Sequence, residues 1–128
     1  MWRAMAYRVV VVTRAGALRE RVCAALEARG AETCRDLEQA LERGPVDAVI
    51  VDLDPSPRTS GLGILLAAST RVPEARRVLL VEGRASIADA AHAAGVCDHV
   101  LLGLAPSRVD AIADWLVPPS ERVRSLVS

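Results

Sequence analysis

The sequence predicts an open α/β domain in which five parallel strands, in the order 2-1-3-4-5, form a sheet with helices on both faces. Three observations predict it. Short valine-rich runs alternate with amphipathic stretches of helical period five times along the chain. The central run, 46–53, combines β-branched residues with a length typical of a strand buried on both faces. The length of 128 residues suits one domain with one core.

Each expected element of the first half of the chain has its own signal. Four consecutive valines mark a strand over 8–13, and an apolar stripe marks a helix over 15–29, formed by Leu18, Val22, Ala25 and Leu26. Gly30 is placed to end that helix in the left-handed conformation. A short strand over 31–35 follows near a sheet edge. Asp36 then caps a second helix, which a Gly-Pro pair ends after residue 43.

The second half continues the alternation after the central strand. A loop with two prolines leads to an apolar helix over 61–69, and a strand over 77–82 is followed by an Ala-rich helix over 86–94. A fifth strand over 97–102 leads to the last helix, 106–116, whose inward residues are Val109, Ile112, Ala113 and Leu116. We expect residues 1–7 to be a lead-in, 8–117 the domain, and 118–128 a tail or the start of a linker.

The composition excludes several functional classes. Formal net charge is zero, so no bulk field favours nucleic acid or an anionic membrane. The chain has no lysine, which excludes Schiff-base chemistry. Its three cysteines form no CxxC pair, so we expect small buried thiols and neither a metal site nor a cofactor. No apolar run reaches membrane-spanning length and no signal peptide is recognisable, so we expect a cytoplasmic protein.

Three stretches carry a resemblance to response-regulator receiver domains: 8–19, 37–52 and 93–101. The second is the most specific, because it places the phosphorylatable aspartate of that family on Asp52. The resemblance covers nearly the whole chain. It implies the flavodoxin-like fold and a non-enzymatic role in bacterial two-component signal transduction.

The reaction centre of that family is largely replaced in this sequence. The positions of its two Mg²⁺-binding acids, its hydroxyl residue, its lysine and the proline after the lysine are occupied by Thr13, Arg14, Glu82, Leu102 and Gly103. Phosphoryl transfer to a carboxylate needs a metal ion and cationic groups to neutralise the developing charge. We therefore interpret the chain as a pseudo-receiver, in which Asp52 is neither metal-bound nor phosphorylated.

An ion pair is expected where the metal would lie. Arg14 follows the first strand and Asp52 ends the third, and these strands are expected to be neighbours about 4.8 Å apart. Glu82, after the fourth strand, is a second possible partner for the guanidinium, since two nearby carboxylates repel one another without a cation. The sequence thus predicts an Arg14–Asp52 pair that holds the domain in one state.

Receiver domains dock partners through the fourth helix, fifth strand and fifth helix, which implies an interaction surface within 86–116. His99, Leu104 and Trp115 are its candidate contact residues. His99 occupies the family's aromatic switch position, and we expect its side chain to be half-buried. Trp115 lies one position off the inward stripe, so it is either an interface residue or a flank residue that covers the core edge. The partner would be a second copy or another protein, and an output domain would follow in a longer chain.

Two other functions stay open at this point. The chain could be a phosphoaccepting receiver that uses Asp52. Residues 12–32 also resemble the opening of uroporphyrinogen-III synthase, in which a strand ends in a Thr-Arg pair. That enzyme needs two such domains and a longer chain, and it would bind a tetrapyrrole at the carboxyl ends of the strands. His92, on an Ala-rich helix without a partner acid or thiol at metal spacing, is expected to be a surface residue.

Overall fold

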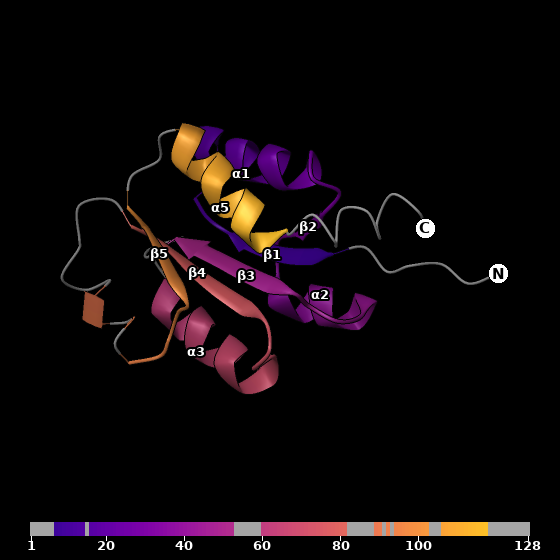
Figure 1. Cartoon of the computed structure of the whole chain (residues 1–128). Helices are drawn as coiled ribbons and strands as arrows, with labels where there is room; N and C mark the ends of the chain where they lie inside the picture. The colour runs from indigo at the N-terminus through magenta and orange to yellow at the C-terminus, as the bar shows by residue number, and fades with distance from the viewer. Residues whose placement is uncertain are drawn as a thin grey trace.

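The sheet has the predicted topology. A computed structural model describes residues 7–14, 16–52, 60–81, 89–90, 92, 94–102 and 106–117. Five parallel strands form one sheet in the order β2-β1-β3-β4-β5 (Figure 1). Their bounds are β1 Arg8–Val12, β2 Glu32–Cys34, β3 Ala48–Asp52, β4 Arg76–Val81 and β5 His99–Leu102. The predicted parallel order 2-1-3-4-5 is confirmed.

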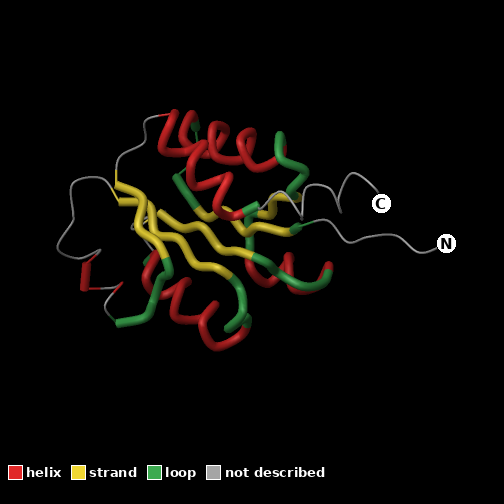
Figure 2. The backbone as a smooth tube through the Cα atoms, in the orientation of Figure 1, coloured by secondary structure: helices red, strands yellow, loops and turns green. Residues whose placement is uncertain are grey.

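Helices cover both faces of this sheet. They are α1 Ala17–Glu27, α2 Leu37–Arg43, α3 Gly61–Arg71 and α5 Pro106–Leu116. Helices α1 and α5 lie on one face and α2 and α3 on the other, so the strands form the middle layer (Figure 2). Of the helix predicted over 86–94, the described residues Asp89, Ala90 and His92 are helical, whereas Ala94 is in a turn.

The core is aliphatic and lies on both sides of the sheet. Val9, Val11 and Ile50 face α1 and α5, whereas Val10 and Val49 face α2 and α3, and all five are fully buried. The alternation of side chains along a strand divides the valine run between the two layers. Both predicted stripes face the core. Val22 and Leu26 of α1 and all four inward residues of α5 are buried, and Leu18 and Ala25 of α1 are partly buried against the same cluster.

Local signals end the elements largely where the sequence predicts. Gly30 has a φ of 86°, the left-handed conformation expected after α1. The Asp36 carboxylate accepts hydrogen bonds from the backbone N–H groups of Glu38 and Gln39 at 2.7 and 3.3 Å, as expected of an N-cap. Tyr7 corrects one expectation: it lies in the expected lead-in, yet only 6% of it is exposed and it packs in the core.

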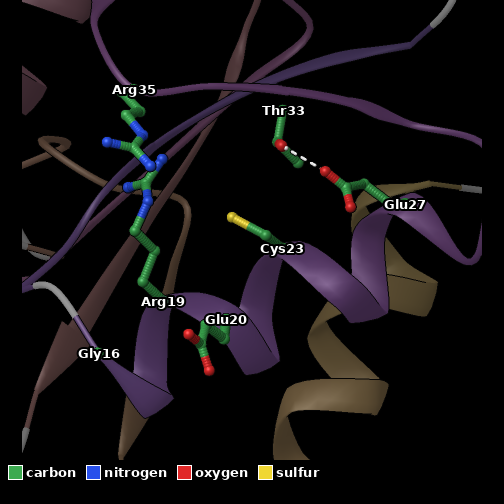
Figure 3. A pocket seen from close by; sticks show the side chains of 7 residues that line it. All are labelled: Gly16, Arg19, Glu20, Cys23, Glu27, Thr33 and Arg35. Atoms are coloured by element: carbon green, nitrogen blue, oxygen red, sulfur yellow. Dashed lines mark hydrogen bonds between the residues drawn. The ribbon is translucent and has the colours of Figure 1, made fainter.

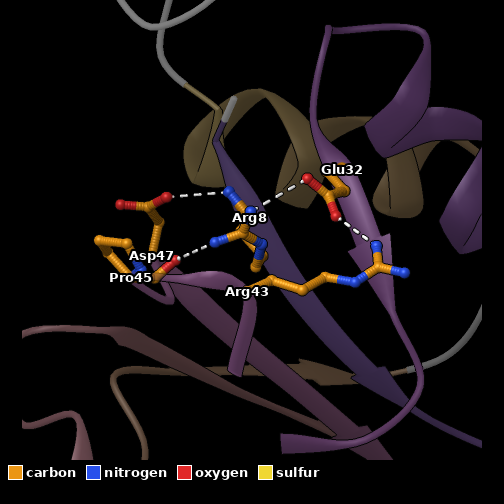
Figure 4. Close-up of polar contacts among 5 residues, drawn as sticks. All are labelled: Arg8, Glu32, Arg43, Pro45 and Asp47. Carbon is orange, nitrogen blue, oxygen red and sulfur yellow. Dashed lines mark hydrogen bonds and ion pairs between the residues drawn. The ribbon is translucent and has the colours of Figure 1, made fainter. Parts of the chain in front are cut away.

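A buried arginine joins β1, β2 and the segment that precedes β3 at the amino edge of the sheet (Figure 4). The Arg8 guanidinium donates to the Pro45 carbonyl oxygen at 3.0 Å and to Glu32 Oε2 at 3.2 Å. Arg43 of α2 pairs with the other Glu32 oxygen, Oε1, at 2.7 Å. The hydrogen bond from Arg43, followed by that from Arg8, lowers the pKa of Glu32 against the opposing effect of its burial. The opposite edge, at the carboxyl ends of the strands, carries a different charged pair.

Candidate functional site

The carboxyl ends of β1 and β3 bring three of the predicted site residues together, Thr13, Arg14 and Asp52. Val12 of β1 is paired with Val51 of β3, so Thr13 and Arg14 leave β1 beside Asp52. Asp52 is the last residue of β3 and is paired with Leu80 on its other side. Strand pairing on both sides fixes the position of the carboxylate at the mouth of the sheet, where ligands bind in open α/β folds.

Arg14 and Asp52 form the predicted ion pair. Arg14 Nε donates to Asp52 Oδ2 at 3.0 Å. Only 8% of the Asp52 side chain is exposed, against 60% of the Arg14 side chain. A carboxylate this buried is unfavourable without an opposite charge or hydrogen-bond donors. The guanidinium therefore covers an acid that the strand pairing keeps out of water.

The described residues do not fit the Mg²⁺ ion that the resemblance implies. Magnesium prefers oxygen ligands, commonly one or two carboxylates with several waters. Here one oxygen of Asp52 already accepts from Arg14, and the Thr13 hydroxyl donates to the Arg14 carbonyl oxygen at 3.2 Å. Across the part of the chain that the structure describes, no three His, Cys, Asp or Glu side chains are grouped to hold a metal ion. Glu82 lies outside the described residues.

A second cluster of side chains lies at the amino ends of β4 and β5. Trp115 is 39% exposed, which confirms the predicted partial exposure. The Arg76 guanidinium carbon lies 4.8 Å from the centroid of the indole ring, and Arg76 Nη1 also donates to the Trp115 carbonyl oxygen. The His99 ring packs on the same indole with centroids 5.5 Å apart. Arg76, His99 and Trp115 are called the Trp115 cluster below.

Two residues of the Trp115 cluster differ from what the sequence predicts: the exposure of His99 was expected to be lower, and Arg76 was not expected there at all. His99 is exposed, so the expectation of a half-buried core residue is wrong: β5 is an edge strand, and this position points to solvent. Arg76 was not predicted as a site residue, because only the strand register brings it beside the last helix. Leu104, the third predicted contact residue, lies outside the described residues. Leu102 is the last residue of β5 and pairs with Val81.

The three cysteines are free thiols, and His92 lies at the surface. Cys34 and Cys97 are buried free thiols, and their burial raises the pKa of each. These two confirm the expected role of cysteine as a small buried residue. Cys23 is partly buried, also a free thiol, and lies on the face of α1 that turns toward β2. His92 is exposed, as predicted.

The topology and the acid at the end of β3 together define a receiver-like flavodoxin fold. Searches of protein-family models and of curated proteins found no match to the chain. Among solved structures, adenylate cyclase from Rhodopirellula baltica matches with a TM-score of 0.73 and 18% identity, over 96% of this chain and 93% of that one. The REC domain of AraT, a response regulator from Geobacillus stearothermophilus, matches with a TM-score of 0.68 and 22% identity, over 94% and 99%.

A longer protein contains the same fold as one part. The response regulator DrrB from Thermotoga maritima matches with a TM-score of 0.67 and 22% identity, over 88% of this chain and 53% of its own. Identities at this level show a common fold, which is that of response-regulator receiver domains. In the described part of this chain, no helix is both long and apolar enough to cross a membrane.

Proposed function

We propose that this chain is a receiver-like regulatory module that acts through protein contacts and without Mg²⁺-dependent phosphorylation of Asp52. The observation that carries the proposal is the 3.0 Å ion pair between Arg14 and Asp52. Aspartyl phosphorylation requires a free carboxylate oxygen as nucleophile and a metal ion to neutralise the transferred group. The Arg14 guanidinium occupies Oδ2 and adds a fixed positive charge where the metal would lie.

The same pair supports constitutive action. A receiver that switches needs two states of similar free energy, with phosphorylation favouring one of them. A guanidinium stays charged at every physiological pH, so Arg14 keeps its positive charge beside Asp52. The module would therefore present one docking surface at all times, in the cytoplasm and without enzymatic activity.

We assign docking to the 86–116 surface. Two of its predicted contact residues, His99 and Trp115, lie in the described part of the chain. Tryptophan offers a large rigid contact area, and partly exposed aromatic and arginine side chains are enriched at the energetic centres of interfaces. Arg76 extends this surface from the adjacent strand. The partner is a second copy of the chain or another protein, with neither nucleic acid nor membrane bound directly. The length of DrrB supports an output domain after residue 117 in a longer chain.

A Mg²⁺ titration followed by amide NMR tests the first half of the proposal. We expect no saturable shift of the Thr13 and Asp52 amide signals at low millimolar Mg²⁺. Saturable shifts confined to these residues would contradict it. The Arg14→Ala variant is the positive comparison, because it exposes the carboxylate to the ion.

Association measured by analytical ultracentrifugation and by pull-down with the isolated chain tests the docking half. Trp115→Asp should weaken both self-association and partner capture, because it removes the indole and places a negative charge on this surface. Leu66→Asp is the matched control, since Leu66 is the other exposed large hydrophobic residue described and lies on α3, on the opposite face. Equal losses in the two variants would contradict the assignment of the surface.

A further inference from the structure

A cleft of about 380 Å³ lies between α1 and β2, and its lining includes no residue of the Arg14–Asp52 pair or of the Trp115 cluster. Figure 3 shows its lining: one wall is the face of α1 that carries Arg19 and Cys23, and the other is β2 with Thr33 and the following Arg35. We call it the α1–β2 cleft. Its volume lies within the range of small-molecule sites in proteins, roughly 300–1,000 Å³.

Two arginines in this cleft differ from six other arginines that the structure describes. Ion pairs with carboxylates hold the guanidiniums of Arg8, Arg14, Arg29, Arg43, Arg71 and Arg77. Within the described part of the chain, neither Arg19 nor Arg35 pairs with an acid, although both line the same cleft. Figure 3 shows their side chains pointing toward one another. Two like charges in one concavity repel, and a bound anion would relieve that repulsion.

Two acids, Glu20 and Glu27, also line the cleft, but in the described structure neither forms an ion pair with Arg19 or Arg35. Glu27 accepts a hydrogen bond from the Thr33 hydroxyl at 2.9 Å, which holds it at the other end of the cleft. Glu20 is exposed, and its carboxylate points away from the two guanidiniums in Figure 3. Figure 3 shows the Cys23 side chain between the two guanidiniums and the Glu27 carboxylate.

A hydrogen bond to the backbone of β1 positions the guanidinium of Arg19. Arg19 Nη1 donates to the Val11 carbonyl oxygen at 2.6 Å, which fixes the side chain against β1. A guanidinium has five N–H donors, so four of them stay available for a ligand. Arg35 is exposed at the carboxyl end of β2 and can move toward a bound group without breaking a contact in the described structure.

We propose that the α1–β2 cleft binds a small molecule through a phosphate group held by Arg19 and Arg35. Planar guanidinium forks match the several oxygens of a phosphate, and a dianion matches two positive charges. The partly buried Cys23 and the Thr33 hydroxyl offer an apolar and a polar contact for the rest of the molecule. This assigns the chain a ligand site that uses neither Asp52 nor the residues of the docking surface.

Titration of the full chain with inorganic phosphate and with pyrophosphate, at constant ionic strength, tests the proposal. We expect saturable NMR shifts of the Arg19 and Arg35 side-chain Nε–H signals and of the Cys23 and Thr33 amides. Arg35→Gln should weaken binding about tenfold, since it removes charge-assisted hydrogen bonds. Arg19→Gln should weaken binding in the same way. Arg35→Gln is the more informative variant, because Arg35 makes no side-chain contact on which the described part of the fold depends.

Two controls separate a phosphate site from general attraction to arginine. Arg71→Gln removes an exposed arginine at the end of α3, on the other face of the sheet, and should leave binding unchanged. Succinate carries two carboxylates and should bind more weakly than pyrophosphate. The proposal is overturned if neither phosphate probe gives saturable shifts, if succinate binds as tightly, or if Arg35→Gln binds pyrophosphate like the unmodified chain.

Discussion

Replacing Arg14 by alanine should destabilise the fold through Asp52. The Asp52 side chain is 8% exposed, so loss of the guanidinium leaves a buried carboxylate without the donor 3.0 Å away. An unsatisfied buried polar group costs about 1–3 kcal/mol, more for a charge. Because Arg14 itself is 60% exposed, solvent screens the pair and water can enter the vacated space. We therefore take the lower end, about 1 kcal/mol, as the expected loss.

A double-mutant cycle isolates this interaction. Asp52→Asn keeps the shape of the side chain and removes its charge, so Arg14→Ala should cost little in that background. Urea denaturation measures the four variants; with a slope of about 1.5 kcal/mol per molar urea, the expected shift of the midpoint is about 0.7 M. An equal effect of Arg14→Ala in both backgrounds would refute the reasoning, because it would mean that Arg14 does not act through Asp52.

Two further predictions concern other groups. Arg43 and Arg8 lower the pKa of Glu32 in the folded state, so its ion pairs contribute stability above the unfolded pKa of about 4.3, and this contribution is lost as pH falls through the lower folded value. Glu32→Gln should thus destabilise the fold at pH 7 but not in strong acid. A difference in unfolding free energy between the two proteins that stays constant with pH would be the contrary result. Burial raises the pKa of Cys34 and Cys97, so at mild alkaline pH iodoacetamide should modify the partly buried Cys23 first, as peptide mass mapping would show. Equal labelling of all three in the folded protein would contradict this.

Much of the fold could be predicted because its signals are local. The valine run of β1 and the stripes of α1 and α5 follow directly from residue spacing, and strict alternation of strands and helices leaves few topologies. The Arg14–Asp52 pair was also predictable, since the ends of neighbouring parallel strands must meet at one edge of the sheet.

Contacts that depend on register or on packing between distant elements were not predictable. Arg76 reaches Trp115 across 39 residues, and His99 joins them only because β5 is an edge strand. Tyr7 carries no periodic signal that would place it in the core rather than in a lead-in. The α1–β2 cleft brings Arg19 and Arg35 together through the packing of a helix on a strand, which no spacing in the sequence indicates.

The most direct test of the proposed function is intact-mass measurement after incubation with acetyl phosphate and Mg²⁺. The unmodified chain, with Arg14 on Asp52, should gain no phosphoryl group under conditions that modify a phosphorylatable receiver domain assayed alongside it. Asp52→Asn serves as the matched control for modification elsewhere. A phosphoryl adduct on the unmodified chain that is absent from Asp52→Asn would contradict the account, because it would show that Asp52 accepts phosphate despite its ion pair.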